Sequence, residues 1–226
     1  MSARKGFPGL SGGGWGIVCD FDGTITPFDV TDAVLDAFAD KQWEEIEREW
    51  TGGGITAREC MERQIGLLRV SPRELDAFLD RVPLTAGFAE FVAVCRSRKL
   101  DLSIVSDGMD YAITRVLARH GLEGVPVLAN RLVFRGGSRY ALEFPHGAEG
   151  CPSGMCKCGL TRGTGRRILL IGDGSSDCCL AGEAAFVLAK RHRKLERHCL
   201  ENNYPCRPYD DFFDILRFLC GSGRLP

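Results

Sequence analysis

The segment of residues 17–26 constrains the fold of this chain more than any other. Residues 17–19 are apolar and partly β-branched, which is typical of a buried strand, and Gly23 supplies the turn that ends it. Asp20 and Asp22 therefore follow the carboxyl end of a strand, where open α/β sheets bind ligands. Side chains at i and i+2 of an extended segment share a side, and two close carboxylates need a cation or a raised pKa. A hard divalent ion such as Mg²⁺ satisfies this need.

Length and charge narrow the class of partner. The 226 residues suffice for one large or two small domains, and 44% of them are hydrophobic, which is enough to fill a core. The formal net charge of -1 gives no basic excess that would recruit nucleic acid or an anionic membrane. We therefore expect a small-molecule substrate, no nucleic acid, no membrane, and a monomer or a homodimer.

The start of the chain and its cysteines indicate the compartment. Residues 1–14 contain Arg4 and Lys5 but no apolar core of secretory length, and they end in glycines, so we expect a flexible leader. No later segment reads as a transmembrane span. Several of the eleven cysteines lie in apolar runs that suit buried thiols. Without a secretory signal, such thiols favour a reducing cytoplasm.

Two kinds of pattern divide the rest of the chain. Residues 29–81 have apolar residues at helical spacing, with a proline-led helix start at Ser71. From residue 83, helix and strand patterns alternate, which indicates a parallel sheet. We expect an α/β fold with a Rossmann-like core, and a helical cap inserted after the first strand can act as a lid. The predicted bounds are 15–28 and 84–226 for the core, 29–83 for the cap, 126–128 for a short strand, 132–140 for a β-hairpin flap and 209–219 for a last helix.

Two further strand ends carry polar groups. Ser106, Asp107 and Gly108 follow a strand at 102–105 and precede a helix, so a hydroxyl and backbone N–H groups can receive an anion there. Taken alone, this serine has the ordinary structural reading of a helix N-cap. Asp173 and Asp177 follow the apolar strand 168–171 across a turn. Three strand ends with polar groups together favour a site.

These segments resemble the motifs of the haloacid dehalogenase superfamily, beginning with Asp-x-Asp-Gly-Thr at residues 20–24. The resemblance implies a C1-type helical cap and Mg²⁺-dependent hydrolysis of a phosphomonoester through an aspartyl phosphate. It makes Asp20 the nucleophile and Asp22 the general acid and base. It also implies that Ser106 takes part in catalysis. The substrate would be bound by Thr24, Ser106, Asp107 and Gly108, and the metal by Asp20, Asp22, Asp173 and Asp177.

The superfamily further uses a cation that neutralises the nucleophile and the phosphate. Lys157 and Arg162 are both candidates for this catalytic role, and Lys190 is a more distant one. The Cys-Lys-Cys-Gly segment at residues 156–159 resembles the methionine-salvage phosphatases that act on 2-hydroxy-3-keto-5-methylthiopentenyl-1-phosphate. Lined up in that way, Arg162 takes the position of the expected lysine, and Lys157 is the alternative.

The order of the motifs resembles the phosphoserine-phosphatase-like branch, so phosphoserine or another small phosphate ester is an alternative substrate. The cysteines offer an alternative of another class, a metal or redox regulatory module with a vestigial phosphatase site. Cys151, Cys156 and Cys158 lie within eight residues and would hold a structural Zn²⁺ if a fourth ligand such as His146 joined them. Their spacing lacks the paired Cys-x-x-Cys of familiar zinc sites, so a disulfide or free thiols are the other states.

Overall fold

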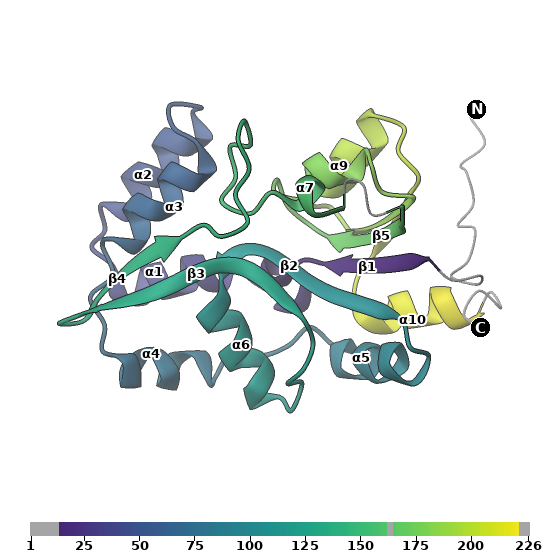
Figure 1. The fold of residues 1–226 in the computed structure, drawn as a ribbon, viewed down its shortest axis with the longest axis horizontal. Coiled ribbons are helices and arrows are strands. Elements are labelled where there is room, and N and C mark those ends of the chain that lie inside the picture. Colours follow the sequence, from purple (N-terminus) through teal and green to yellow (C-terminus); the bar gives the residue numbers. More distant parts are fainter. Residues whose placement is uncertain (1–13, 162–164, 222–226) are drawn as a thin grey trace.

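The computed structural model describes residues 14–161 and 165–221. Seven strands form one sheet in the order β4-β3-β2-β1-β5-β6-β7 (Figure 1). Neighbouring strands are parallel except β3 and β4, which form an antiparallel hairpin. The strand bounds are β1 Trp15–Cys19, β2 Asp101–Met109, β3 Val127–Gly136, β4 Arg139–Glu143, β5 Arg167–Gly172, β6 Phe186–Lys190 and β7 Cys206–Tyr209.

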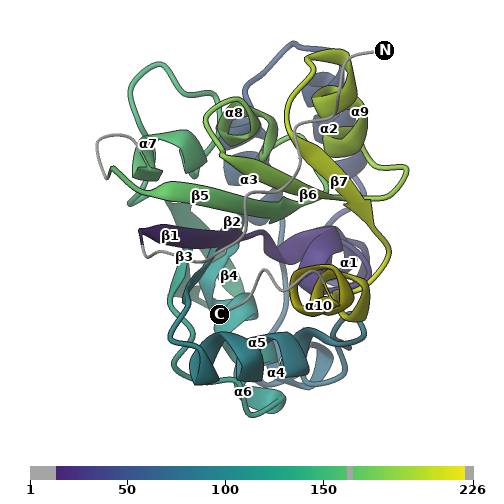
Figure 2. The same ribbon diagram turned by 90° about the vertical axis from the view of Figure 1, so that its right-hand side faces the viewer.

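Helices cover both faces of this sheet (Figure 2). Because strand side chains alternate, Ile17 and Cys19 of β1 join one buried cluster with α1, α5, α6 and α10, whereas Val18 joins another with α8 and α9. The central strand is therefore apolar on both faces, as the sequence of residues 17–19 predicts. The helix bounds are α1 Val30–Phe38, α2 Trp43–Thr51, α3 Ala57–Ile65, α4 Pro72–Leu79, α5 Phe88–Ser97, α6 Asp110–Arg119, α7 Lys157–Thr161, α8 Cys178–Ala181, α9 Lys194–Glu201 and α10 Phe212–Gly221.

The helical pattern predicted for residues 29–81 is confirmed by α1 to α4. Ser71 caps α4 with its side chain, Glu74 completes the capping box, and Pro72 lies in the first turn. Leu35 and Leu75 from these helices join the same buried cluster as α5 and α6 of the sheet domain. A division into a core and a cap of residues 29–83 stays a prediction.

The structure corrects three secondary-structure predictions. The strand predicted at 102–105 does not end before Ser106, because β2 continues through Ser106, Asp107 and Gly108 to Met109, with a shift in its register against β3 after Val105. The last helix begins at Phe212 and not at Tyr209, because Tyr209 pairs with Lys190 across β7 and β6. A four-residue edge strand has too few positions to show alternation, and the strong helical spacing that follows masks it. The strand 126–128 and the first arm of the hairpin 132–140 form a single strand, β3, which turns into β4.

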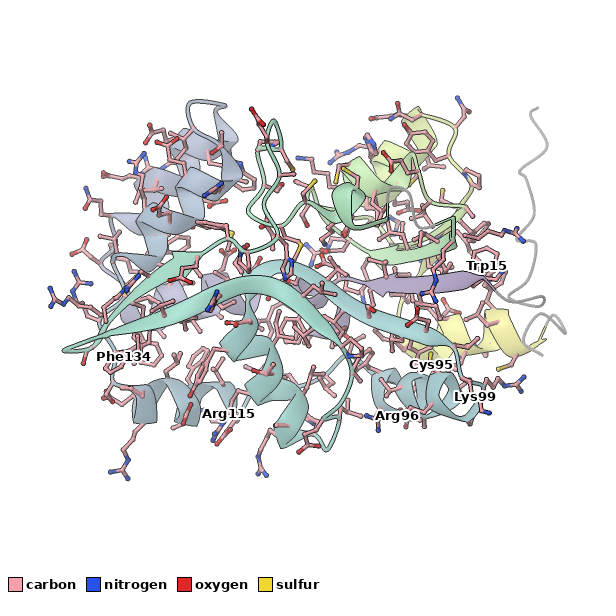
Figure 3. All side chains as sticks on the ribbon, in the orientation of Figure 1. Trp15, Cys95, Arg96, Lys99, Arg115 and Phe134 are labelled. Carbon is pink, nitrogen blue, oxygen red and sulfur yellow. The ribbon has the colours of Figure 1, made fainter. Side chains whose placement is uncertain are left out.

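Trp15 and Phe134 lie at opposite ends of the strands (Figure 3). Trp15 begins β1, and the guanidinium carbon of Arg167 lies 4.4 Å from the centre of its ring. Phe134 lies at the far end, on the hairpin, and is 51% exposed.

No helix in the described part of the chain is both long and apolar enough to cross a bilayer.

Candidate active site

The end of β1 places Asp20 inside the protein. The backbone N–H of Asp20 donates to the carbonyl of Ile171, so the chain is still held against β5 at this point. The carboxylate of Asp20 then accepts a hydrogen bond from the N–H of Phe21 at 2.8 Å, which fixes its direction at the start of a tight turn. With only 5% of its surface exposed, Asp20 is a buried carboxylate at the carboxyl edge of the sheet.

Lys157, the first residue of α7, provides the counter-charge. Its Nζ lies 2.8 Å from Oδ1 of Asp20 and 2.7 Å from Oδ1 of Asp177, and its side chain has no exposed surface. Burial acts to lower the pKa of Lys157, but Asp177 and Asp20 outweigh it, so the pKa is raised. The lysine therefore stays charged between two carboxylates.

Three carboxylates converge at this lysine. One oxygen from each of Asp20, Asp173 and Asp177 lies within 4.8 Å of the others, and no other His, Cys, Asp or Glu residues of the described ranges form such a group. Burial raises the pKa of Asp20, Asp177 adds to the rise and Lys157 opposes it. Burial and Asp177 raise the pKa of Asp173 to about 6. One ammonium does not balance three carboxylates, so the group suits a hard divalent cation.

The donors around these carboxylates show which oxygens are available for a cation. Oδ1 of Asp177 accepts from Lys157, and its Oδ2 accepts from the N–H groups of Asp173 and Gly174, each at 3.1 Å. Oδ2 of Asp20 and both oxygens of Asp173 accept no hydrogen bond from the described residues. The donor set therefore fits a cation held by Asp20 and Asp173, with Asp177 orienting the loop and the lysine.

Gly23 is required for this convergence. Its φ of +71° lies in the left-handed region, and a Cβ built on it would lie 2.5 Å from Oδ2 of Asp173. Any side chain at residue 23 would therefore displace the carboxylate of Asp173. The glycine that ends the strand in the sequence pattern thus also makes room for the second carboxylate.

Asp22 and Ser106 lie close together, beside Gly108. Asp22 accepts a hydrogen bond from the N–H of Val30 at 2.8 Å, at the start of α1. Ser106 is 1% exposed, and its Oγ accepts from the N–H of Gly108 at 3.0 Å. A Cβ on Gly108 would lie 2.5 Å from Oδ2 of Asp22 and 3.2 Å from Oγ of Ser106. The close approach of this glycine brings the two side chains to one place.

Asp22 is suited to carry a proton. Burial raises its pKa well above the ordinary value, Asp29 adds to the rise, and the hydrogen bond from Val30 opposes it. A carboxyl group with a raised pKa can donate a proton near neutral pH and accept it back later. The geometry therefore gives Asp20 and Asp22 different chemical capacities.

The pattern of the haloacid dehalogenase-like hydrolase family matches residues 17–182 of the chain. The chain belongs to this family. This hydrolase is also 33% identical over 214 residues to the 2-hydroxy-3-keto-5-methylthiopentenyl-1-phosphate phosphatase of Brevibacillus brevis, covering 90% of this chain and 94% of the relative. The phosphatase of the same name from Geobacillus kaustophilus is 34% identical over 209 residues, covering 88% and 93%.

Solved structures support the fold of the hydrolase. A substrate-bound phosphoserine phosphatase superposes with a TM-score of 0.67 at 19% identity, covering 92% of this chain and 99% of the other. A phosphoserine phosphatase described as a phospho-aspartyl intermediate analogue gives a TM-score of 0.65 at 20% identity, covering 90% and 97%. The predicted superfamily, its Rossmann-like fold and its enzyme class are confirmed.

The hydrolase brings together most of the predicted site residues. Asp20, Asp173, Asp177 and Lys157 meet directly, and Asp22 meets Ser106 and Gly108. Thr24 is fully buried in the turn, and its carbonyl accepts from the Thr85 hydroxyl. The carboxylate of Asp107 accepts from the N–H of Met155 and from Asn130. Sequence reasoning missed Asn130, although a polar residue within an apolar run was a usable signal.

The three candidate cations are in different situations. Lys157 contacts Asp20, as described above. Arg162 lies outside the described residues. Lys190 donates to the backbone carbonyl of Asp210 at 2.6 Å and lies over the ring of Tyr209. The hydrolase therefore offers Lys157 as the cation beside Asp20.

The cysteine segment gives no support for the predicted zinc site. The sulfur atoms of Cys156 and Cys158 are 3.7 Å apart, but Cys151, Cys156 and Cys158 do not form a group of three ligand atoms within 4.8 Å. All three are free thiols. Cys179 of α8, which sequence reasoning did not connect with them, interacts with Cys158 and helps to raise its pKa.

Proposed function

We propose that this hydrolase is a Mg²⁺-dependent phosphatase that transfers the phosphoryl group of a small-molecule ester to Asp20 and then to water. The observation that carries the proposal is the buried carboxylate of Asp20, paired through Oδ1 with Lys157 and facing Asp173. A carboxylate in this setting is a nucleophile whose direction is fixed before substrate binds.

The residues divide the reaction between them. The free oxygen of Asp20 attacks phosphorus while Asp22 gives its proton to the departing alkoxide, and Asp22 later takes a proton from the water that attacks the aspartyl phosphate. Lys157 and Ser106 hold the phosphoryl oxygens, where negative charge is greatest in the transition state. Mg²⁺, when bound by Asp20 and Asp173, supplies positive charge that offsets the repulsion between carboxylate and phosphate.

The relatives favour one substrate. Two phosphatases of 2-hydroxy-3-keto-5-methylthiopentenyl-1-phosphate match nearly the whole chain at 33% and 34% identity. The phosphoserine phosphatase structures match at 19% and 20% identity, which supports the fold alone. We therefore propose 2-hydroxy-3-keto-5-methylthiopentenyl-1-phosphate as the substrate, which would place the enzyme in methionine salvage.

The test is phosphate release from a panel that contains this substrate, phosphoserine and other small phosphate esters, with Mg²⁺ and after chelation. We expect the first compound to have the highest kcat/KM and chelation to stop turnover reversibly. A higher kcat/KM for phosphoserine would refute the proposed substrate. Full activity without divalent metal would refute the proposed role of Mg²⁺.

The covalent step needs its own test. Asp20→Asn should abolish turnover because an amide is not a competent nucleophile, whereas Asp40→Asn, at an exposed carboxylate, should leave it unchanged. Acid quenching of the wild-type enzyme during turnover of ³²P-labelled substrate should trap a hydroxylamine-sensitive phosphoenzyme. Near wild-type turnover by Asp20→Asn, in a preparation free of deamidated protein, would end the covalent mechanism.

A further inference from the structure

The segment of residues 144–156, here called the connecting loop, joins β4 to Lys157 and lies between α3 and α7 (Figure 1). On the α3 side, the N–H of Arg58 donates to the carbonyl of Pro152 at 3.0 Å, and the Arg58 guanidinium carbon lies 4.7 Å from the centre of the Phe144 ring. The N–H of Cys156 donates to the carbonyl of His146, which closes the loop on itself. The loop is thus a defined structure that ends at the buried lysine.

Its other side is held by Asp107, the residue after Ser106. Oδ1 of Asp107 accepts from the N–H of Met155 at 2.8 Å and from Nδ2 of Asn130 at 3.0 Å. The same Nδ2 donates to the backbone carbonyl of Asp107, so Asn130 binds both the side chain and the backbone of that residue. Asn130 is 1% exposed and Met155 is fully buried, so water does not compete easily for these hydrogen bonds.

The packing at this point leaves no room for adjustment. A Cβ on Gly154 would lie 2.8 Å from Oδ1 of Asn130 and would overlap the ring of Phe144. The backbone of the connecting loop therefore rests directly on Asn130, and only glycine permits the approach. Met155 follows at once, with Lys157 two residues later.

We propose that Asp107 is a positioning residue that acts with Asn130 to fix the end of the connecting loop, and with it Lys157, relative to Ser106. This inference rests on the proposed function, in which Lys157 and Ser106 bind the same phosphoryl group. It gives Asp107 a role different from the substrate contact that the family resemblance implies. The donors to Oδ1 of Asp107 are neutral N–H groups, so the role requires an acceptor oxygen at that point and not a negative charge.

This distinction sets the experiment. Asp107→Asn keeps an acceptor oxygen for Met155 and Asn130, whereas Asp107→Ala removes it. With p-nitrophenyl phosphate as the probe, we expect Asp107→Ala to lower kcat by about 10- to 100-fold with a smaller change in KM, since a displacement near 1 Å can cost a hundredfold. Asp107→Asn should stay within about threefold of wild type, because it retains the geometry.

A second readout does not depend on activity. Hydrogen exchange of the Met155 amide should become faster in Asp107→Ala and remain slow in Asp107→Asn, because only the first variant frees this N–H. Gly154→Ala, which pushes the loop away from Asn130, should also speed exchange of this amide and lower kcat. It serves as the second variant if Asp107→Ala fails to fold.

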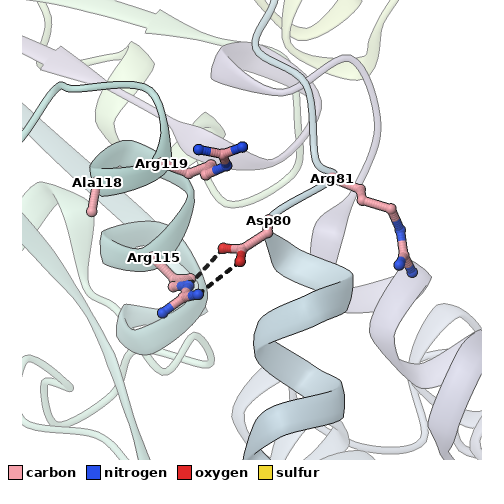
Figure 4. A pocket seen from close by; sticks show the side chains of 5 residues that line it. All are labelled: Asp80, Arg81, Arg115, Ala118 and Arg119. Carbon is pink, nitrogen blue, oxygen red and sulfur yellow. Dashed lines mark hydrogen bonds and ion pairs between the residues drawn. The ribbon is translucent and has the colours of Figure 1, made fainter.

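A matched control lies on the far side of the molecule. Asp80, which directly follows α4, binds Arg115 on α6 through two hydrogen bonds of 2.7 Å, beside a surface hollow of ≈ 520 Å³ (Figure 4). Asp80→Ala removes a carboxylate with two donors but touches no site residue. We expect it to leave kcat, KM and the exchange of the Met155 amide unchanged.

Two outcomes would overturn the positioning role. If Asp107→Asn loses as much kcat as Asp107→Ala while the Met155 amide stays protected, the negative charge is needed and Asp107 contacts substrate. If Asp107→Ala keeps both kcat and protection, the hydrogen bonds do not hold the loop. Failure of the wild-type enzyme on every phosphate ester would instead overturn the proposed function, and the exchange experiment would still decide whether Asp107 holds Met155.

Discussion

Replacing Lys157 with methionine is the most informative single change in this protein. Methionine has a similar length and an apolar end, so it fills the space but leaves the carboxylates of Asp20 and Asp177 without their cation. The lysine has no exposed side-chain surface, which prevents water from taking over its role. We therefore expect a loss of both stability and catalytic rate, from one cause.

The size of the loss follows from the two ion pairs of 2.8 and 2.7 Å. At an effective dielectric constant of about 20, each pair gains about 6 kcal/mol of attraction, and most of this is offset by the desolvation of three charges. Removing one partner of a buried ion pair costs about 3–5 kcal/mol, because the remaining charge is uncompensated. Deleting a cation that binds the transition state also lowers kcat by about a hundredfold or more.

Urea unfolding and phosphate release at saturating substrate measure the two losses separately. The double variant Lys157→Met with Asp177→Asn removes one excess charge, so it should recover part of the stability but none of the rate. Arg162→Ala is the comparison for the alternative cation and should keep kcat within about threefold. The reasoning is refuted if Lys157→Met unfolds within 1 kcal/mol of wild type and keeps its kcat, or if Arg162→Ala alone shows the hundredfold loss.

Three further predictions concern the carboxylates, the turn and the cysteines. The pKa of Asp173 is raised to about 6. Between pH ~4 and pH ~6 this carboxylate therefore holds more proton in the folded protein than in the unfolded chain. Without metal, the free energy of unfolding should fall as the pH rises through this window. Mg²⁺ should accordingly raise Tm more at pH ~7.5 than at pH ~5. Equal increases in Tm at the two pH values would contradict a metal site at Asp20 and Asp173. Gly108→Ala should lower kcat about tenfold or more by displacing the side chain of Asp22, as steady-state kinetics would show. Gly124→Ala would meet no atom within 4 Å, so it should leave kcat unchanged even though the φ of +84° makes alanine costly for stability there. Serine at all three cysteines of residues 151–158 should lower stability or raise KM and still allow a trapped phosphoenzyme, and failure to phosphorylate Asp20 in a folded triple variant would show that the thiols belong to the chemistry.

The sequence is sufficient to predict the residues that follow strand ends. An apolar run followed by a turn determines both the strand and the edge of the sheet where the next polar residue lies, so Asp20 and Asp173 can be found without a structure. The same pattern also finds Ser106, although β2 continues past it to Met109. The antiparallel hairpin and the helices of residues 29–81 are also visible as periodic patterns. These features depend on short-range order, which the sequence shows directly.

The choice of cation depends on long-range packing, which periodicity does not show. Lys157 and Arg162 are five residues apart in a segment with little periodic structure, and the contact that singles out Lys157 joins it to Asp20, a residue far away in the sequence. The sequence marks Asn130 as a polar residue in an apolar run but does not show its role, because that role lies in contacts with Asp107 of another strand. The strand that contains Tyr209 is missed from the sequence because its four residues give only two alternations, and the helical spacing that follows is stronger.

The charges of the site determine how the enzyme should respond to pH. Lys157 stays protonated because Asp177 and Asp20 outweigh its burial, so its own titration does not contribute near neutral pH. The carboxylates titrate instead, because burial and Asp177 raise the pKa of Asp20 and Asp173 by more than Lys157 lowers it. A divalent cation would lower both values by favouring the charged forms. The acid limb of kcat/KM should therefore move to lower pH as the Mg²⁺ concentration rises, and a limb that does not move would mean that metal and protons do not compete for these carboxylates.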